Sequence, residues 1–294
     1  MKIEEAVAVL KASPDHRVIE RLPILTHYFP EDQSEKKLAI YLDTETTGFR
    51  AGEDHVIELA MILFEYNAQG YIYRIVDVFD EYQDPGIPIP EQITKITGIT
   101  DEMVKGKSID LEKVKELLDQ AALVIAHNAQ FDRAFAEELT PLFKQKCWAC
   151  SLEDVPWADE GLESSKLEYL AYRFGFFYEG HRAKTDCYAG IHLLSQDLPT
   201  NGKKVLAQLL ENAKAPRYEV RAIQSPFETK DVLKTRGYRW KQIAKNQKCW
   251  VTMVVGDAIE QEKAFLESEI YSGHQSTYEI KKISPFERFS LRDS

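Results

Sequence analysis

Two acidic residues with the spacing of a β-strand are the first candidates for chemistry. Asp43 and Glu45 follow residues 38–42, an apolar run typical of a buried strand. Residues i and i+2 of a strand point to the same face, roughly 6.6 Å apart along the backbone. Two such carboxylates in an apolar setting repel each other and lose hydration unless a cation or protons neutralise them. The pair indicates a metal site, although a solvated strand end with this spacing is more common.

A second cluster follows another apolar run. Residues 123–126 are typical of a buried strand and lead into the segment His-Asn-Ala-Gln-Phe-Asp at 127–132. Asn128 is a candidate N-cap of the helix that follows, and Asp132 lies in its first turn. The helix dipole stabilises an acid in a first turn without any metal. Asp132 is therefore a candidate ligand only in combination with the first pair of acids.

The third cluster precedes and begins a helix predicted at 183–197. Residues five apart on a helix differ by about 140° in direction, so His181 and Asp186 cannot share one helical face. We therefore expect His181 in the loop after Gly180, above a site to which Asp186 contributes from the helix. A histidine between charged neighbours is also common on a protein surface.

The elements that must position these clusters form a mixed arrangement. Strands are predicted at 38–42, 56–64, 71–79, 123–126 and 147–152, and helices at 91–96, 111–119, 166–174 and 183–197. A hairpin turn at 67–70 makes the first three strands an antiparallel meander. The later strands alternate with helices, which favours an α/β fold.

Taken in order, the clusters resemble the DnaQ-like, DEDD-type 3′→5′ exonucleases, in the subgroup with His in the last motif. The matching motifs are Asp43-Thr44-Glu45 with Thr46-Thr47-Gly48, His127-Asn128 with Phe131-Asp132, and His181-x-Ala183-x-x-Asp186. The resemblance covers about residues 36–198. It implies a ribonuclease H-like fold, which is a mixed sheet flanked by helices. The chain departs from the family's pattern at Thr97, where relatives often have His before the Gly-Ile pair.

The resemblance also implies roles in the hydrolysis of a phosphodiester by two divalent cations, Mg²⁺ or Mn²⁺. Asp43 would bridge both ions. Glu45 and Asp186 would hold the ion that binds the attacking water, and Asp132 would support the second ion. His181 would be the general base, because the ordinary pKa of a histidine, about 6.5, suits proton transfer near neutral pH.

The same resemblance places the terminal nucleotide on the turn after the first motif. This turn consists of Thr46, Thr47, Gly48 and Phe49. Phe131 would add a contact, and Asn128 would contact the backbone or only cap its helix. The expected partner is nucleic acid with a 3′ end, DNA in preference to RNA, and the expected product is a nucleoside monophosphate. Two alternatives stay open. They are a 3′→5′ exoribonuclease, since the motifs show no 2′-hydroxyl contact, and an inactive nucleic-acid-binding or scaffold protein.

Charge divides the chain into two parts. Residues 1–200 contain 20 Lys and Arg against 36 Asp and Glu, whereas residues 201–294 contain 17 against 12. No apolar run approaches the roughly 20 residues that span a bilayer, so we expect a cytoplasmic protein without a membrane partner. The expected domains are a helical arm packed on the main domain (1–35), the exonuclease domain (36–200), a helical linker (201–216) and a small α+β domain (217–294).

The C-terminal segment has its own pattern. Strands are predicted at 218–223, 238–241, 249–255 and 278–283, and helices at 228–236 and 257–270, with a turn centred on Asn246. This βαββαβ order suggests a ferredoxin-like arrangement. Candidate contacts to single-stranded nucleic acid are Arg236, Arg239, Trp240 and Lys241. The alternative is that the aromatic residues belong to the core and the charges only solvate the outside.

Overall fold

The computed structural model describes residues 2–244, 247–273 and 275–291. The chain divides into two compact units, residues 1–213 and 214–294. Helix α8 (Val205–Lys214) lies in the segment predicted as a linker, and its apolar residues are buried in the core of the first unit. Within the described ranges, every helix is too short or too polar to cross a bilayer.

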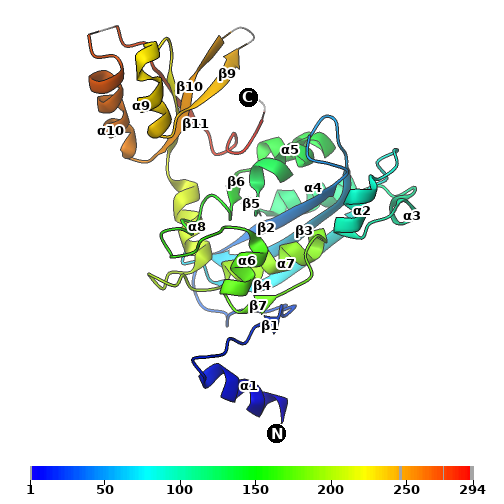
Figure 1. Ribbon diagram of the computed structural model, residues 1–294. Coiled ribbons are helices and arrows are strands. Elements are labelled where there is room, and N and C mark those ends of the chain that lie inside the picture. Colours follow the sequence, from blue (N-terminus) through cyan, green and yellow to red (C-terminus); the bar gives the residue numbers. More distant parts are fainter. Residues whose placement is uncertain (1, 245–246, 274, 292–294) are drawn as a thin grey trace. The chain divides into compact units, whose positions relative to one another are not determined.

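A five-stranded mixed sheet is the centre of the first unit (Figure 1). Its strands are β2 (Lys36–Thr46), β3 (Val56–Asn67), β4 (Ile72–Tyr82), β5 (Leu123–Ala126) and β6 (Trp148–Cys150). Their order is β4-β3-β2-β5-β6, with antiparallel pairing along the meander and parallel pairing to β5 and β6. The predicted meander and mixed sheet are confirmed.

Helices cover both faces of this sheet. The helices that follow the meander are α2 (Glu91–Thr97), α3 (Asp101–Val104), α4 (Leu111–Gln120), α5 (Ala129–Leu139), the 3-10 helix η1 (Pro141–Gln145), α6 (Leu167–Arg173) and α7 (Ala183–Leu194). Figure 1 shows α6 and α7 on one side of the sheet and α4 and α5 on the other. Helix α7 packs so closely on β2 that a Cβ on Gly190 would overlap the buried ring of Tyr41. This close contact brings the start of α7 to the end of β2.

The N-terminal arm is held by backbone pairing and not by its helix. Helix α1 (Ile3–Ala12) forms as predicted but buries none of its residues, and Ile3 is 80% exposed. Within the arm expected to pack on the main domain, the helix itself therefore makes no buried contact. The arm is fastened further along, where β1 (Glu20–Arg21) pairs with β7 (Phe176–Phe177) and Leu22 enters the core.

The second unit is a four-stranded antiparallel sheet with two main helices. Its elements are β8 (Arg217–Ala222), η2 (Phe227–Thr229), α9 (Lys230–Thr235), β9 (Arg239–Ala244), β10 (Gln247–Val255), α10 (Ala258–Phe265), the π-helical turn η3 (Leu266–Ile270) and β11 (Glu279–Ile283). The strand order β11-β8-β10-β9 is that of the ferredoxin-like arrangement, as predicted. The predicted turn at Asn246 lies outside the described residues.

Candidate active site

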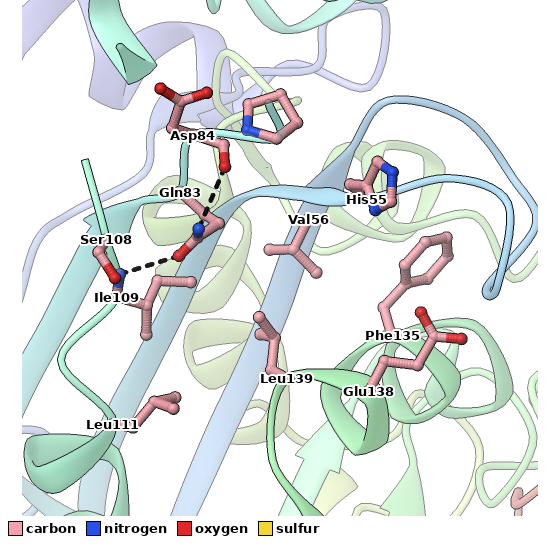
Figure 2. Close-up of a pocket in the computed structure, with 11 residues that line it drawn as sticks. His55, Val56, Gln83, Asp84, Ser108, Ile109, Leu111, Phe135, Glu138 and Leu139 are labelled. Carbon is pink, nitrogen blue, oxygen red and sulfur yellow. Dashed lines mark hydrogen bonds between the residues drawn. The ribbon is translucent and has the colours of Figure 1, made fainter. Parts of the chain in front are cut away.

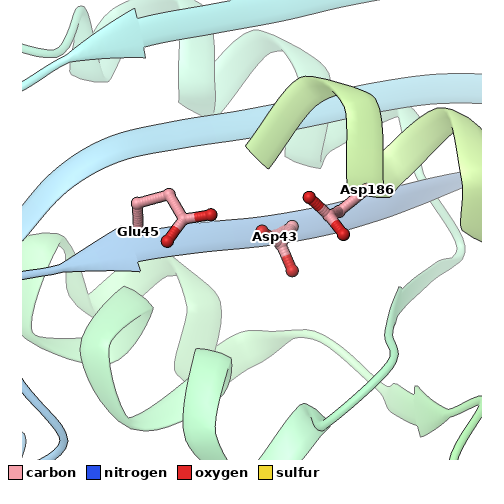
Figure 3. A group of neighbouring side chains, drawn as sticks. All are labelled: Asp43, Glu45 and Asp186. Carbon is pink, nitrogen blue, oxygen red and sulfur yellow. The ribbon is translucent and has the colours of Figure 1, made fainter. Parts of the chain in front are cut away.

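Three of the four predicted acids meet where β2 approaches α7 (Figure 3). Asp43 and Glu45 lie on one face of β2, because they are two residues apart, and Asp186 faces them from the first half of α7. One carboxylate oxygen from each residue lies within 4.8 Å of the others. The geometry is that of a cluster able to hold a cation.

The electrostatics of the cluster favour a bound cation. Burial, with the neighbouring charges of Asp132 and Asp186, raises the pKa of Asp43 well above its ordinary range. Burial and nearby acids, Asp186 first, raise the pKa of Glu45 to about 8, and burial raises that of Asp186 to about 6. The acids therefore resist ionisation next to one another. Carboxylate oxygens are the ligands that Mg²⁺ and Mn²⁺ prefer, so the donor set fits a hard divalent cation.

Asp132 reaches the same region from α5 but is not one of the three clustered acids. Its Oδ1 accepts hydrogen bonds from the backbone N–H (3.1 Å) and the hydroxyl (3.0 Å) of Thr44. Thr44 lies between Asp43 and Glu45 on β2, so these bonds fix α5 to the strand that carries the first motif. Burial raises the pKa of Asp132 to about 7.

His181 lies in the loop before α7, as predicted. Its φ is 64°, a left-handed conformation that is uncommon for a residue with a side chain. The imidazole is half-exposed, and its Nε2 lies 3.7 Å from Oε1 of Glu168 on α6. A strained, exposed histidine beside a carboxylate cluster is a candidate for proton transfer.

Asp186 has two partners that the motifs did not indicate. The hydroxyl of Tyr178 donates to its Oδ1 (3.1 Å), and the backbone N–H of Arg182 donates to its Oδ2 (3.0 Å). The Arg182 side chain in turn binds Glu58 on β3, the residue opposite Glu45. An acid inside the apolar run of β3 was the only sequence signal for Glu58, and no motif pointed to Tyr178.

The turn after the first motif is held by its own hydroxyl groups. The Thr46 hydroxyl donates to the carbonyl of Gly48, and the Thr47 hydroxyl accepts the backbone N–H of His55 (2.9 Å). Phe49 is 80% exposed at the tip of the turn. Thr46 and Thr47 are buried, so the turn presents the aromatic ring of Phe49 to solvent.

Residues of the second motif lie beside this turn. The ring of Phe131 on α5 lies 6.5 Å from that of Phe49, centroid to centroid. Asn128 occupies the N-cap position of α5, but its side chain makes no capping hydrogen bond and is exposed. The simple capping role is therefore wrong, and the exposed amide is available for a ligand.

A separate cavity of about 450 Å³ lies on the α5 side of the sheet (Figure 2). Val56, Ile109, Phe135 and Leu139 supply apolar lining. None of the clustered carboxylates lines it.

The structure does not bring the four C-terminal candidates onto one surface. Arg236 forms an ion pair with Glu262 (3.0 Å) and lies 3.9 Å from the ring of Phe265. The other three are consecutive on β9, so Arg239 and Lys241 point to one face and Trp240 to the other. Trp240 packs edge-on against Trp250, with ring centroids 5.5 Å apart.

Comparison with known proteins identifies the family. The Exonuclease family model, RNase_T, matches residues 40–194, more than half of the chain. The chain belongs to this exonuclease family, and the resemblance to DnaQ-like exonucleases is confirmed.

Relatives and a solved structure show how far the similarity extends. The chain is 37% identical over 168 residues to DNA polymerase III PolC-type of Pediococcus pentosaceus, covering 52% of this chain and 11% of that protein. It is 31% identical over 195 residues to DNA polymerase III PolC-type of Caldanaerobacter subterraneus, covering 63% and 13%. The chain thus spans only about a tenth of the length of these relatives. The zinc-bound E. coli ExoI–ssDNA complex has a TM-score of 0.50 at 16% identity, covering 74% of this chain and 63% of that one, which shows the shared fold.

Proposed function

We propose that the chain is a metal-dependent 3′→5′ exonuclease that releases nucleoside monophosphates from DNA. The observation that carries this proposal is the cluster of Asp43, Glu45 and Asp186, whose raised pKa values favour a cation, inside a domain of the exonuclease family. The named relatives are DNA polymerases, which supports DNA over RNA.

The clustered acids would hold Mg²⁺ or Mn²⁺, and Asp132 would support a second ion. When bound, such ions neutralise charge at phosphorus, stabilise the leaving oxygen and acidify a water. The charges of Asp132 and Asp186 raise the pKa of both Asp43 and Glu45, so the four acids would share the task of holding the ions. Tyr178 and the Arg182 backbone orient Asp186 by hydrogen bonds to its two oxygens. The chain thus supplies an oriented, partly buried set of oxygen ligands.

His181 would take the proton of the attacking water on a ring nitrogen. Its loop position and exposed side chain leave it free to move over a bound substrate. Phe49 and Phe131 would pack against the terminal base, and the Asn128 amide would contact the sugar-phosphate backbone. The second unit, whose segment of the chain carries net positive charge, would add affinity for a polyanion.

The test compares single-stranded DNA, duplex DNA and RNA of one sequence, labelled at the 5′ or the 3′ end, with Mg²⁺ and with EDTA. We expect 5′-labelled DNA to shorten one nucleotide at a time and 3′-labelled DNA to release mononucleotide at once. The Asp43→Asn variant should digest DNA at least 10³-fold more slowly than wild type. The control variant Asp119→Asn changes an exposed aspartate that pairs with Lys115, and its digestion rate should match the wild type. Unchanged digestion by the Asp43 variant would refute the site, and faster digestion of RNA would favour the exoribonuclease.

A further inference from the structure

An ion pair between the buried Glu58 and the half-exposed Arg182 ties the third motif to the sheet. Glu58 on β3 is 1% exposed, and its Oε1 accepts from Nη2 (2.8 Å) and Nε (3.3 Å) of Arg182. Its Oε2 accepts the backbone N–H of Ala183 (2.9 Å), the first residue of α7. Arg182 also donates to the hydroxyl of Tyr82 on β4. Two neighbouring strands therefore hold the start of α7 by charge-assisted hydrogen bonds, which are short and directional.

Arg182 stands between the two functional residues of the third motif. It directly follows His181, and its backbone N–H binds Oδ2 of Asp186. Glu58 lies opposite Glu45 in the β2–β3 ladder. The ion pair thus connects the strand beside the first motif with both the loop and the helix of the third.

Stability alone does not account for a fifth carboxylate at this place. An ion pair with a buried partner is often no more stabilising than apolar residues of the same size, and here it places a further carboxylate, neutralised by Arg182, beside four acids. The hydrogen bonds of the Glu58 carboxylate instead indicate a role at the start of α7. Arg182 and Ala183 engage both oxygens of Glu58, so this carboxylate is bound at the helix start and is not one of the three clustered acids.

We propose that Glu58 and Arg182 are positioning residues that fix the start of α7, so that Asp186 and His181 face Asp43 and Glu45. Their role rests on the proposed exonuclease function. Neither side chain belongs to the ligand cluster, and both act through the residues that they hold.

The experiment uses the full chain with three variants: Arg182→Met, the double variant Glu58→Gln/Arg182→Met, and Lys184→Met as a control. Lys184 lies in the same helical turn and also pairs with a strand acid, Asp80 (2.6 Å). The measurements are Mn²⁺ affinity by calorimetry, kcat and KM on single-stranded DNA, and Tm in EDTA.

We expect Arg182→Met to lower the Tm, because it leaves Glu58 buried without its cation. It should weaken Mn²⁺ binding at least tenfold and lower kcat at least 30-fold, with KM within threefold of wild type. The double variant should regain most of the lost Tm but not the Mn²⁺ affinity or kcat, because neutralising both partners does not restore the anchor. Lys184→Met should stay within twofold of wild type in every binding and kinetic value.

A folded double variant with wild-type Mn²⁺ affinity and kcat would overturn the positioning role. This variant tests the positioning role even if Arg182→Met does not fold. If the wild type binds Mn²⁺ but digests no nucleic acid, the proposed function fails. The calorimetric comparison of the variants still tests the positioning role in that case.

Discussion

Replacing Glu45 by Gln should stabilise the metal-free protein at alkaline pH. Burial and the neighbouring acids raise the pKa of Glu45 from an ordinary 4.5 to about 8. Between these values the unfolded chain has released the proton while the native protein still binds it. The unfolded state therefore binds fewer protons, and the free energy of unfolding falls as pH rises through this window.

Linkage sets the size of the effect. For pKa values of 4.5 and about 8, the free energy of unfolding falls by roughly 3–4 kcal/mol between pH 5 and pH 8. This is an upper bound for one residue, because the clustered acids titrate together and one proton can serve two of them. Glutamine has the same shape and no charge, so Glu45→Gln removes this term. We expect the variant to be more stable than wild type by about 1–3 kcal/mol at pH 8 and by less than about 1 kcal/mol at pH 5.

The assay is urea unfolding in EDTA across pH 5–8, repeated with 10 mM Mg²⁺. Glu163→Gln is the control, since Glu163 is an exposed glutamate outside the cluster, and it should stay within about 0.5 kcal/mol of wild type at every pH. Mg²⁺ should stabilise the wild type more than Glu45→Gln, because the ion neutralises the same charges. A variant no more stable than wild type at pH 8 in EDTA would refute the electrostatic account of the cluster.

Three other predictions follow from the site. His181→Ala should lower kcat by about 10²–10⁴ with little change in KM, measured under saturating Mg²⁺; an unchanged kcat would exclude the base role. Phe49→Ala should raise KM several-fold for single-stranded DNA and leave the Tm within about 2 °C of wild type, because the ring is exposed; equal KM values would remove Phe49 from the substrate site. Gly190→Ala should lower the free energy of unfolding in urea by about 1–3 kcal/mol, because the added Cβ would overlap the Tyr41 ring; an unchanged free energy of unfolding would contradict the close contact between α7 and β2.

Residues that are close in sequence were predictable, because their geometry is local. The two-residue spacing of Asp43 and Glu45 determines their common face on β2, and the five-residue spacing of His181 and Asp186 separates loop from helix. The order of apolar runs likewise indicated the meander. Each of these inferences needs only the period of one strand or one helix.

Contacts between distant residues do not follow from local periodicity: the family resemblance indicated that Asp186 meets Asp43 and Glu45, but it did not indicate the contacts outside the motifs. Glu58 and Arg182 are 124 positions apart, and only the folded sheet brings them together. The C-terminal candidates are different, because the alternation along β9 separates Trp240 from Arg239 and could have been applied to the sequence.

The packing of α7 on β2 explains why the ligand cluster and the core depend on each other. Tyr41 precedes Asp43 by two residues on one face of β2, a distance of about 6.6 Å. Gly190 follows Asp186 by four residues on α7, a distance of about 6.0 Å. The strand and the helix run in opposite directions here, so Tyr41 contacts Gly190 and Asp43 approaches Asp186. These are successive contacts of one interface, because the two spacings are nearly equal. The absence of a side chain at Gly190 therefore allows the close approach at which the two acids meet, and a larger residue there, by pushing the helix outward, should move Asp186 away from Asp43 and Glu45.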